Sequence, residues 1–237
     1  MPDRFYCPEL AADQAVRLEG AEAHHLSRVL RKSVGDVVEL FDGSGRAVAA
    51  EVTGISKKTA DLRLLDFKET PPPGVEIILA SAVPKGDRFR WLVEKATELG
   101  VDRLIPLVTD RSVVKPGEGK REKMEQAVIE ACKQSGRNRL MRIAEPTSLD
   151  AVLELCSAGN LLTLFAHPSG QPLKETFQKE LPASIVLLVG PEGGWSEEEV
   201  AKASAAGSVS VSLGANILRI ETAAMALAAL VALWRDE

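Results

Sequence analysis

The sequence predicts an α/β protein with a mostly parallel β-sheet covered by helices on both faces in residues 75–237, and a small, mostly β region in residues 1–70. Apolar, β-branched runs alternate with segments of helical period after residue 74, as in a parallel sheet covered by helices. Short alternating runs separated by turn signals fill the first region, as in a small barrel. Between the two patterns lies Pro71-Pro-Pro-Gly74. Because consecutive prolines cannot continue a strand ladder, residues 71–74 are predicted to be a linker.

The composition is that of an ordinary globular protein. Of 237 residues, 45% are hydrophobic and 27% are charged, which are average values. The formal net charge of −5 argues against a protein that coats nucleic acid by charge alone, but it leaves a local basic patch open. Cys7, Cys132 and Cys156 form no CxxC pair and the three histidines have no ligand spacing, so we expect no metal site.

The sequence shows no recognisable signal peptide and no membrane-spanning segment. The first residues show no basic-then-apolar signal peptide. The longest apolar run, 223–234, is shorter than the ~20 residues that a membrane span requires. Scattered cysteines are typical of a reducing compartment. We therefore expect a cytoplasmic protein with no membrane association.

The first region shows one helical segment and three strands. Apolar residues with helical spacing predict a helix over residues 20–31. The runs 36–43 and 46–52 read as strands, and Asp42-Gly-Ser-Gly45 between them is a hairpin signal. A further alternating run over residues 59–65 predicts a third strand.

The second region alternates strands and helices. The predicted strands are 75–80, 101–108, 161–165, 185–189 and 209–213. The predicted helices are 87–99, 120–135, 149–157, 173–180 and a last helix from about residue 221. Gly100 and Gly136 each follow a predicted helix, where glycine commonly ends the helical turn.

Two glycine-bearing loops connect strands to helices near the C-terminus. The first runs from Gly190 to Ser196, where Ser196 and Glu199 have the spacing of a capping box at a helix start. The second begins at Leu213-Gly214. Glycine allows backbone to approach a ligand closely, and open α/β sheets bind ligands at the carboxyl ends of their strands. The two loops therefore read as a pair of pocket walls, or else as ordinary tight turns.

Both loops carry a resemblance to a known family. GPEGGWSEEE at 190–199 and LGANILRIETA at 213–223 resemble the C-terminal signature of the ribosomal RNA small subunit methyltransferase E family, 16S rRNA uridine-N3 methyltransferases of the SPOUT class. Other segments resemble the same family, namely HHLSRVLR at 24–31, KGDR at 85–88, EKATELG at 94–100 and EACKQSGR at 130–137. The matches run through nearly the whole chain.

The resemblance implies the fold and the activity. It implies a PUA-like, RNA-binding β-barrel over residues 1–70 and a SPOUT domain with a trefoil knot over residues 75–237. It implies methylation of N3 of one uridine near the decoding centre of 16S rRNA, with S-adenosyl-L-methionine (SAM) as the methyl donor. The expected partners are 16S rRNA, in an assembled small ribosomal subunit, and a second copy of the chain. The last helix is apolar all round, which also favours burial between two subunits.

Cofactor residues follow from the same resemblance. Main-chain groups of three loops would bind the adenosine, with apolar side chains beside the base, as is usual in ligand pockets. The predicted cofactor-binding residues are Ala166, His167, Val189, Gly190, Gly193, Gly194, Leu213, Gly214, Ile217 and Leu218.

The chemistry requires the uridine N3 to lose its proton before methyl transfer. A general base, or a cation that stabilises the imide anion, would serve. Arg219 and Glu221 are the catalytic candidates, and Arg137 is a third that would reach the same site only across a dimer interface. In the alternative reading, Glu221 caps the last helix and Arg219 pairs with it.

Basic residues supply candidates for RNA phosphate contacts, because arginine binds phosphate in a bidentate manner. A solvated charged face is the alternative reading. The predicted RNA-binding residues are Arg28, Arg31, Lys85, Arg88, Lys133, Arg137 and Arg139.

Three positions depart from the family pattern: Asn216, Ile220 and Met141. Two other functions remain open, a SPOUT enzyme acting on another RNA site and an RNA-binding assembly module without catalysis. Dinucleotide and P-loop enzymes are poorly supported, because neither GxGxxG nor GxxxxGK[ST] occurs.

Overall fold

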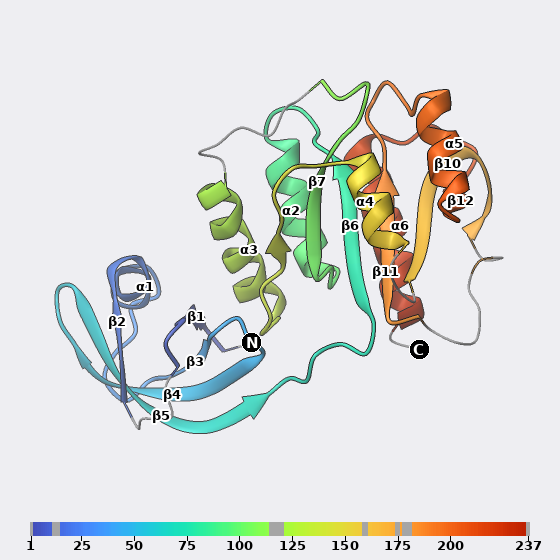
Figure 1. Cartoon of the computed structure of the whole chain (residues 1–237). Helices are drawn as coiled ribbons and strands as arrows, with labels where there is room; N and C mark the ends of the chain where they lie inside the picture. The colour runs from blue at the N-terminus through green and yellow to red at the C-terminus, as the bar shows by residue number, and fades with distance from the viewer. Residues whose placement is uncertain are drawn as a thin grey trace. The chain divides into compact units, whose positions relative to one another are not determined.

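The chain forms two compact units, shown in Figure 1. The structure, a computed structural model, describes residues 2–10, 15–113, 121–157, 161–173, 176 and 182–235. The N-terminal unit comprises Met1–Pro72 together with Ile129–Leu140, and the C-terminal unit comprises Pro73–Val128 with Met141–Glu237. The segment Ile129–Leu140 thus belongs with the first unit although C-terminal-unit residues flank it in the sequence.

The N-terminal unit is a curled five-stranded sheet, a half-barrel that fits the predicted small β domain (Figure 1). The strand order is β1-β3-β4-β5-β2, and all pairs are antiparallel except β1 with β3. The strands are β1 Arg4–Tyr6, β2 Ala15–Glu19, β3 Val37–Phe41, β4 Arg46–Ile55 and β5 Thr59–Glu69. Sequence reasoning did not predict β1 and β2.

The helical segment predicted over residues 20–31 is confirmed in a modified form. It is an α-helix, α1 Gly20–His24, that continues as a π-helical turn over His25–Val29. Alternating strand residues and this segment together fill one core, as the side-chain period of two in a strand requires. Its largest contributors include Phe5, Leu26, Leu40, Val48, Val52 and Leu62.

The C-terminal unit is built on a seven-stranded sheet in which every described pair is parallel. The order is β12-β10-β11-β6-β7-β8, with β9 also beside β7. The strands are β6 Glu76–Ala82, β7 Arg103–Val108, β8 Arg142–Ile143, β9 Thr147–Ser148, β10 Leu161–Pro172, β11 Ser184–Val189 and β12 Val209–Ser212.

Helices cover both faces of this sheet, as predicted. The helices are α2 Arg88–Glu98, α3 Arg121–Ser135, α4 Leu149–Cys156, α5 Glu197–Ala205 and α6 Ile220–Arg235. On one face α6 packs against α2, β6 and β11. On the other, α4 and α5 bury Val152 and Ala203 against sheet residues such as Val186. None of the described helices is long and apolar enough to cross a membrane.

Three local expectations differ from the structure or lie beyond it. Strand β10 runs on from the predicted 161–165 to Pro172, with an irregularity between Ala166 and Gln171, both of which pair with Val211. Most of the helix predicted at 173–180 lies outside the described residues. The trefoil knot stays a prediction.

The last helix is not buried on every side within one chain, so its predicted burial between two subunits stays a prediction. Ile220, Ala224, Leu227 and Val231 recur at helical spacing and are buried. On α6 Leu233 remains 67% exposed.

Candidate functional site

Three segments of the C-terminal unit surround one cavity. Two are the loops that follow β11 and β12, and the third, residues 166–168, lies within β10, where its pairing with β12 becomes irregular. The three strands are neighbours in the sheet, so these segments meet at one edge. The cavity has a volume of about 150 Å³ and is partly open to solvent. Its lining residues are Ala166, His167, Pro168, Val189, Gly190, Pro191, Glu192, Gly194, Trp195, Leu213, Gly214, Asn216, Ile217, Leu218, Ile220 and Ala223. All the residues predicted to bind the cofactor line this cavity except Gly193.

Trp195 forms one wall and was not among the predicted site residues. Its indole Nε1 donates a hydrogen bond to the carbonyl oxygen of Ala166 at 3.0 Å, which ties the β11 loop to β10. The indole ring also stacks on Phe165, with centroids 4.5 Å apart. A Cβ on Gly190 would lie 2.5 Å from Trp195 Cε2. Gly190 is therefore required by the packing of Trp195, a reason that the loop sequence alone does not reveal.

Two other glycines keep the cavity open. Gly194 has φ +70° and Gly214 has φ +122°, a region that L side chains rarely adopt. A Cβ on either would meet no atom within 4 Å, so both face free space. Gly193 instead faces Arg111, whose Nη1 donates hydrogen bonds to the carbonyl oxygens of Gly193 and Trp195 at 2.9 and 3.2 Å.

The predicted capping box at the start of α5 is present. The Ser196 hydroxyl accepts from the Glu199 backbone N–H, and a Glu199 carboxylate oxygen accepts from the Ser196 N–H at 2.8 Å. Glu199 is buried, and its other oxygen accepts from the backbone N–H of Asp110 at 3.0 Å. The cap therefore also fixes the loop after β7 beside the start of α5.

One arginine joins two carboxylates beside the cavity. Arg88, at the start of α2, contacts Glu192 at 2.9 Å and Glu221 at 3.5 Å. The pKa of the Arg88 guanidinium is raised, first by its hydrogen bond to Glu192 and also by the nearby charge of Glu221. Glu221 is buried, and its Oε2 has no hydrogen-bond partner among the described residues. Arg88 was predicted to bind RNA; its guanidinium is held by these two carboxylates.

Arg219 does not pair with Glu221, so that part of the alternative reading is not what the structure contains. Its side chain is exposed and makes no ion pair with any described residue. Its neighbours Leu218 and Ile220 both line the cavity. Arg219 is thus an exposed cation next in sequence to two lining residues, with no ion pair in the part of the chain that the structure describes.

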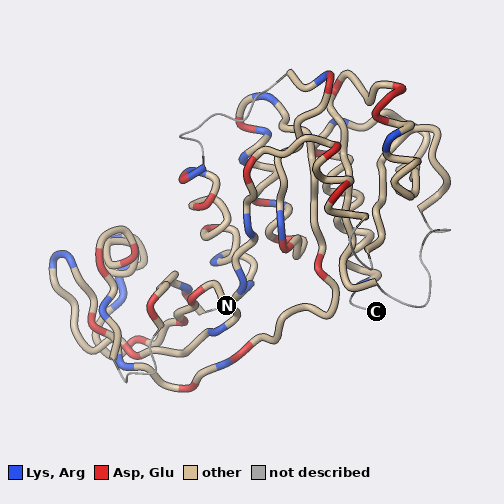
Figure 2. The backbone as a smooth tube through the Cα atoms, in the orientation of Figure 1, with Lys and Arg blue, Asp and Glu red and all other residues tan. Residues whose placement is uncertain are grey.

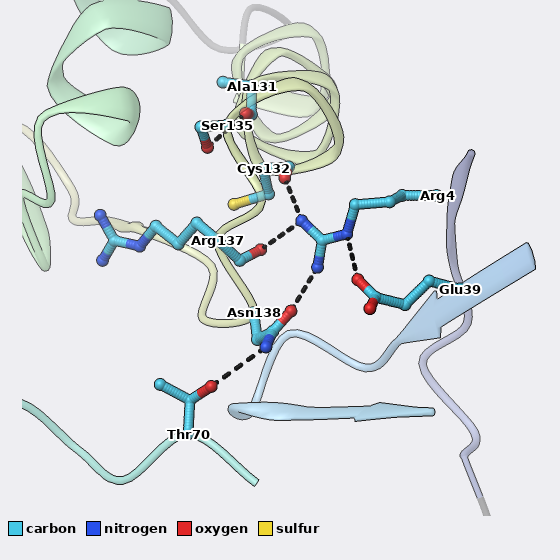
Figure 3. Close-up of polar contacts among 8 residues, drawn as sticks. All are labelled: Arg4, Glu39, Thr70, Ala131, Cys132, Ser135, Arg137 and Asn138. Carbon is cyan, nitrogen blue, oxygen red and sulfur yellow. Dashed lines mark hydrogen bonds and ion pairs between the residues drawn. The ribbon is translucent and has the colours of Figure 1, made fainter. Parts of the chain in front are cut away.

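Within the N-terminal unit, Arg4 is a buried organising residue that sequence reasoning missed (Figure 3). Its guanidinium pairs with Glu39 at 2.7 Å, donates to the carbonyl oxygen of Cys132 at 2.7 Å, and binds the side chain of Asn138. It also donates to the carbonyl oxygen of Arg137 at 3.4 Å. Arg4 therefore secures the segment Ile129–Leu140 to β1 and β3.

Three other residues of the segment Ile129–Leu140 do not take part in holding Arg4 through their side chains. The Arg137 side chain points away from Arg4 in Figure 3. Arg139 donates to the carbonyl oxygen of Thr70 at 2.9 Å. Burial raises the pKa of the Cys132 thiol to about 11, so this thiol is neutral in the cluster.

The other residues predicted to bind RNA differ in how exposed their side chains are and in whether they are paired with a carboxylate. Lys133 has a side chain only 8% exposed and pairs with Glu22 at 3.1 Å, so its charge is satisfied within the unit. Arg28, Arg31 and Lys85 are exposed. Basic residues are spread over both units among acidic ones in Figure 2.

Comparison with known protein families identifies the class of protein to which the chain belongs. Residues 71–232 match the family model of an RNA methyltransferase domain, and residues 18–65 match that of an RNA methyltransferase PUA domain. The chain is therefore an RNA methyltransferase with an N-terminal PUA domain.

Individual relatives narrow the class to one family. Ribosomal RNA small subunit methyltransferase E of Synechocystis sp. is 37% identical over 91% of this chain and 72% of its own length. The structure of the protein of that name from Neisseria gonorrhoeae, bound to SAM, is 34% identical, covers 98% of this chain and 96% of its own, and has a TM-score of 0.87. A Legionella pneumophila protein solved with SAM is 31% identical, covers 98% of this chain and 97% of its own, and has the same TM-score. The chain belongs to the ribosomal RNA small subunit methyltransferase E family.

Proposed function

We propose that this protein methylates N3 of a specific uridine in 16S rRNA, with SAM as the methyl donor. The observation that carries the proposal is the cavity formed by the irregular part of β10 and the loops after β11 and β12. These segments hold the residues that the family resemblance assigns to the cofactor. The two structural relatives described above were both solved with SAM.

The residues that line the cavity suit the chemistry of SAM. Its walls are mostly apolar, with Leu213, Ile217 and Leu218 available to flank an adenine ring. The glycine backbones at 194 and 214 face open space and can approach a ligand closely. When bound, SAM supplies a methyl group on a sulfonium whose leaving group departs neutral. The protein therefore has to act mainly on the acceptor.

Arg219 is proposed to stabilise the deprotonated uracil ring. Arg219 is exposed, and its chain neighbours Leu218 and Ile220 line the cavity. A cation placed where negative charge develops lowers the barrier. Glu221 is buried and held by Arg88, so we propose that it orients this edge of the site. The catalytic role of Arg137 stays a prediction. Because Arg137 belongs to the N-terminal unit, we propose that it contacts RNA.

The proposed RNA surface keeps the predicted basic residues other than two that are paired with carboxylates. Arg88 and Lys133 are occupied by Glu192, Glu221 and Glu22, so they are left out. Phosphate contacts by the others position the RNA and make its affinity depend on salt. The residues proposed to bind RNA are Arg28, Arg31, Lys85, Arg137 and Arg139.

We also propose that the active form is a homodimer acting on the assembled small subunit. The helices α2 and α6 pack together and leave Trp91, Leu230 and Leu233 at 44%, 43% and 67% exposure. Large apolar side chains exposed on neighbouring helices are typical of a subunit interface.

Mass spectrometry of nucleosides from 16S rRNA, in cells with and without this gene, tests the proposed reaction. We expect N3-methyluridine to disappear at one position when the gene is deleted. A different modified nucleoside lost instead would favour an enzyme that acts on another RNA site. Unchanged nucleosides, together with RNA binding but no SAM binding by the purified protein, would favour an assembly module without catalysis.

A further inference from the structure

The cluster of Arg88, Glu192 and Glu221 carries an uncompensated charge. Two carboxylates share one guanidinium, which leaves one net negative charge. The free oxygen of Glu221 is buried and has no hydrogen-bond partner among the described residues. A buried carboxylate without full compensation favours a cation nearby.

This charge lies at the wall of the cavity. Among the described residues that line it, Glu192 is the one with a formal charge at pH 7 when histidine is neutral. Arg88, Arg111 and Arg219 are not among the lining residues. Arg88 is paired with Glu192, and Arg111 donates to the carbonyl oxygens of Gly193 and Trp195. A ligand in the cavity therefore meets a negative wall.

The proposed methyl donor and its product differ in charge. SAM carries a sulfonium and one net positive charge, whereas S-adenosylhomocysteine is a neutral thioether with almost the same shape. A carboxylate at the wall attracts the first by Coulomb interaction and has no net charge to attract in the second. The negative charge of the cavity lining can thus make SAM bind more tightly than S-adenosylhomocysteine, although the two have almost the same shape.

We propose that Glu192 is a specificity-determining residue that favours the charged methyl donor over its neutral product, and that Arg88 is a positioning residue that sets the strength of this preference. Arg88 holds Glu192 through one carboxylate oxygen and offsets part of its charge. After methyl transfer the attraction is lost, which speeds release of the product. This inference rests on the proposed use of SAM.

Isothermal titration calorimetry with SAM and with S-adenosylhomocysteine tests the inference, read as the ratio of the two dissociation constants. In Glu192→Gln we expect the preference for SAM to fall about fivefold, the effect of one partly exposed charge. The drop should shrink as salt rises from low to physiological concentration. The matched control is Glu197→Gln, which removes the same charge from an exposed residue outside the cavity lining and should leave the ratio unchanged.

A second variant changes the charge in the other direction. Arg88→Gln at pH 8 should raise the preference for SAM, while Arg90→Gln, two residues away and paired with Glu94, should not. An unchanged ratio in Glu192→Gln, or an unchanged or lower ratio in Arg88→Gln, overturns the inference. If Arg88 served RNA binding instead, Arg88→Gln would lower the salt slope of RNA affinity and leave the ratio alone. A parent protein that binds neither ligand would contradict the proposed function, which is a separate outcome.

Discussion

Substituting Gly190→Ala is expected to disrupt the cavity by displacing Trp195. The new Cβ would lie 2.5 Å from Trp195 Cε2, about 1 Å closer than ordinary van der Waals contact allows. Trp195 cannot shift freely, because it is stacked on Phe165 and bonded to Ala166. The hydrogen bond is worth about 0.5–1.5 kcal/mol and the aromatic pair a similar amount. Overpacking of this kind typically costs about 1–3 kcal/mol in total.

The assay combines thermal unfolding with SAM calorimetry. A loss of about 2 kcal/mol lowers the midpoint of unfolding by roughly 4–8 °C for a chain of this size. We expect SAM affinity to fall at least about tenfold as well, since Trp195 lines the cavity. Gly74→Ala is the control, because its added Cβ meets no atom within 4 Å and its φ is not in the left-handed region.

A double-mutant cycle decides whether Trp195 is the cause. In a Trp195→Ala background the added methyl group has room, so Gly190→Ala should cost much less than in the parent. Equal penalties in both backgrounds would refute the steric explanation and assign the role of Gly190 to its backbone alone.

Three further predictions concern catalysis, RNA and assembly. Arg219→Ala should slow single-turnover methylation by about 10²–10³-fold with SAM affinity nearly intact, because the lost interaction is made in the transition state. Arg137→Ala should weaken RNA binding and reduce the salt slope of its affinity by roughly one unit or less. Leu233→Glu should convert the dimer to monomers in sedimentation, because it places a charge where an exposed apolar side chain of α6 would be buried.

Each of these has an outcome that contradicts it. Arg219 is not catalytic if Arg219→Ala turns over at the parent rate once RNA is saturating. The RNA contact is wrong if the salt slope of Arg137→Ala equals that of Arg90→Ala, which removes an exposed cation from α2. For assembly, a Leu233→Glu protein that still sediments as a dimer, or a Leu155→Glu control on α4 that also dissociates, would place the interface elsewhere. Leu155 is 58% exposed, so the control adds the same charge at a similar exposure.

Local sequence patterns were enough to predict most of the helices and strands and most of the residues that line the cavity. Alternating apolar runs and helical periods identified β6, β7 and β11, and the spacing of Ser196 and Glu199 located the start of α5. These features depend on residues a few positions apart, so they are readable without tertiary contacts. The glycines in the two loops are readable for the same reason.

Contacts between residues far apart in the sequence determined the features that could not be predicted. Arg88 meets Glu221 across 133 positions, and Arg4 meets Asn138 across 134. No local period signals such pairs, so sequence reasoning did not predict the carboxylate partners of Arg88 and overlooked Arg4. The assignment of Ile129–Leu140 to the N-terminal unit was hidden in the same way, because a segment in the middle of a helical pattern gives no sign of which core it joins. Charge and periodicity along the chain specify what each residue is able to do, and only the folded backbone specifies which partner it meets.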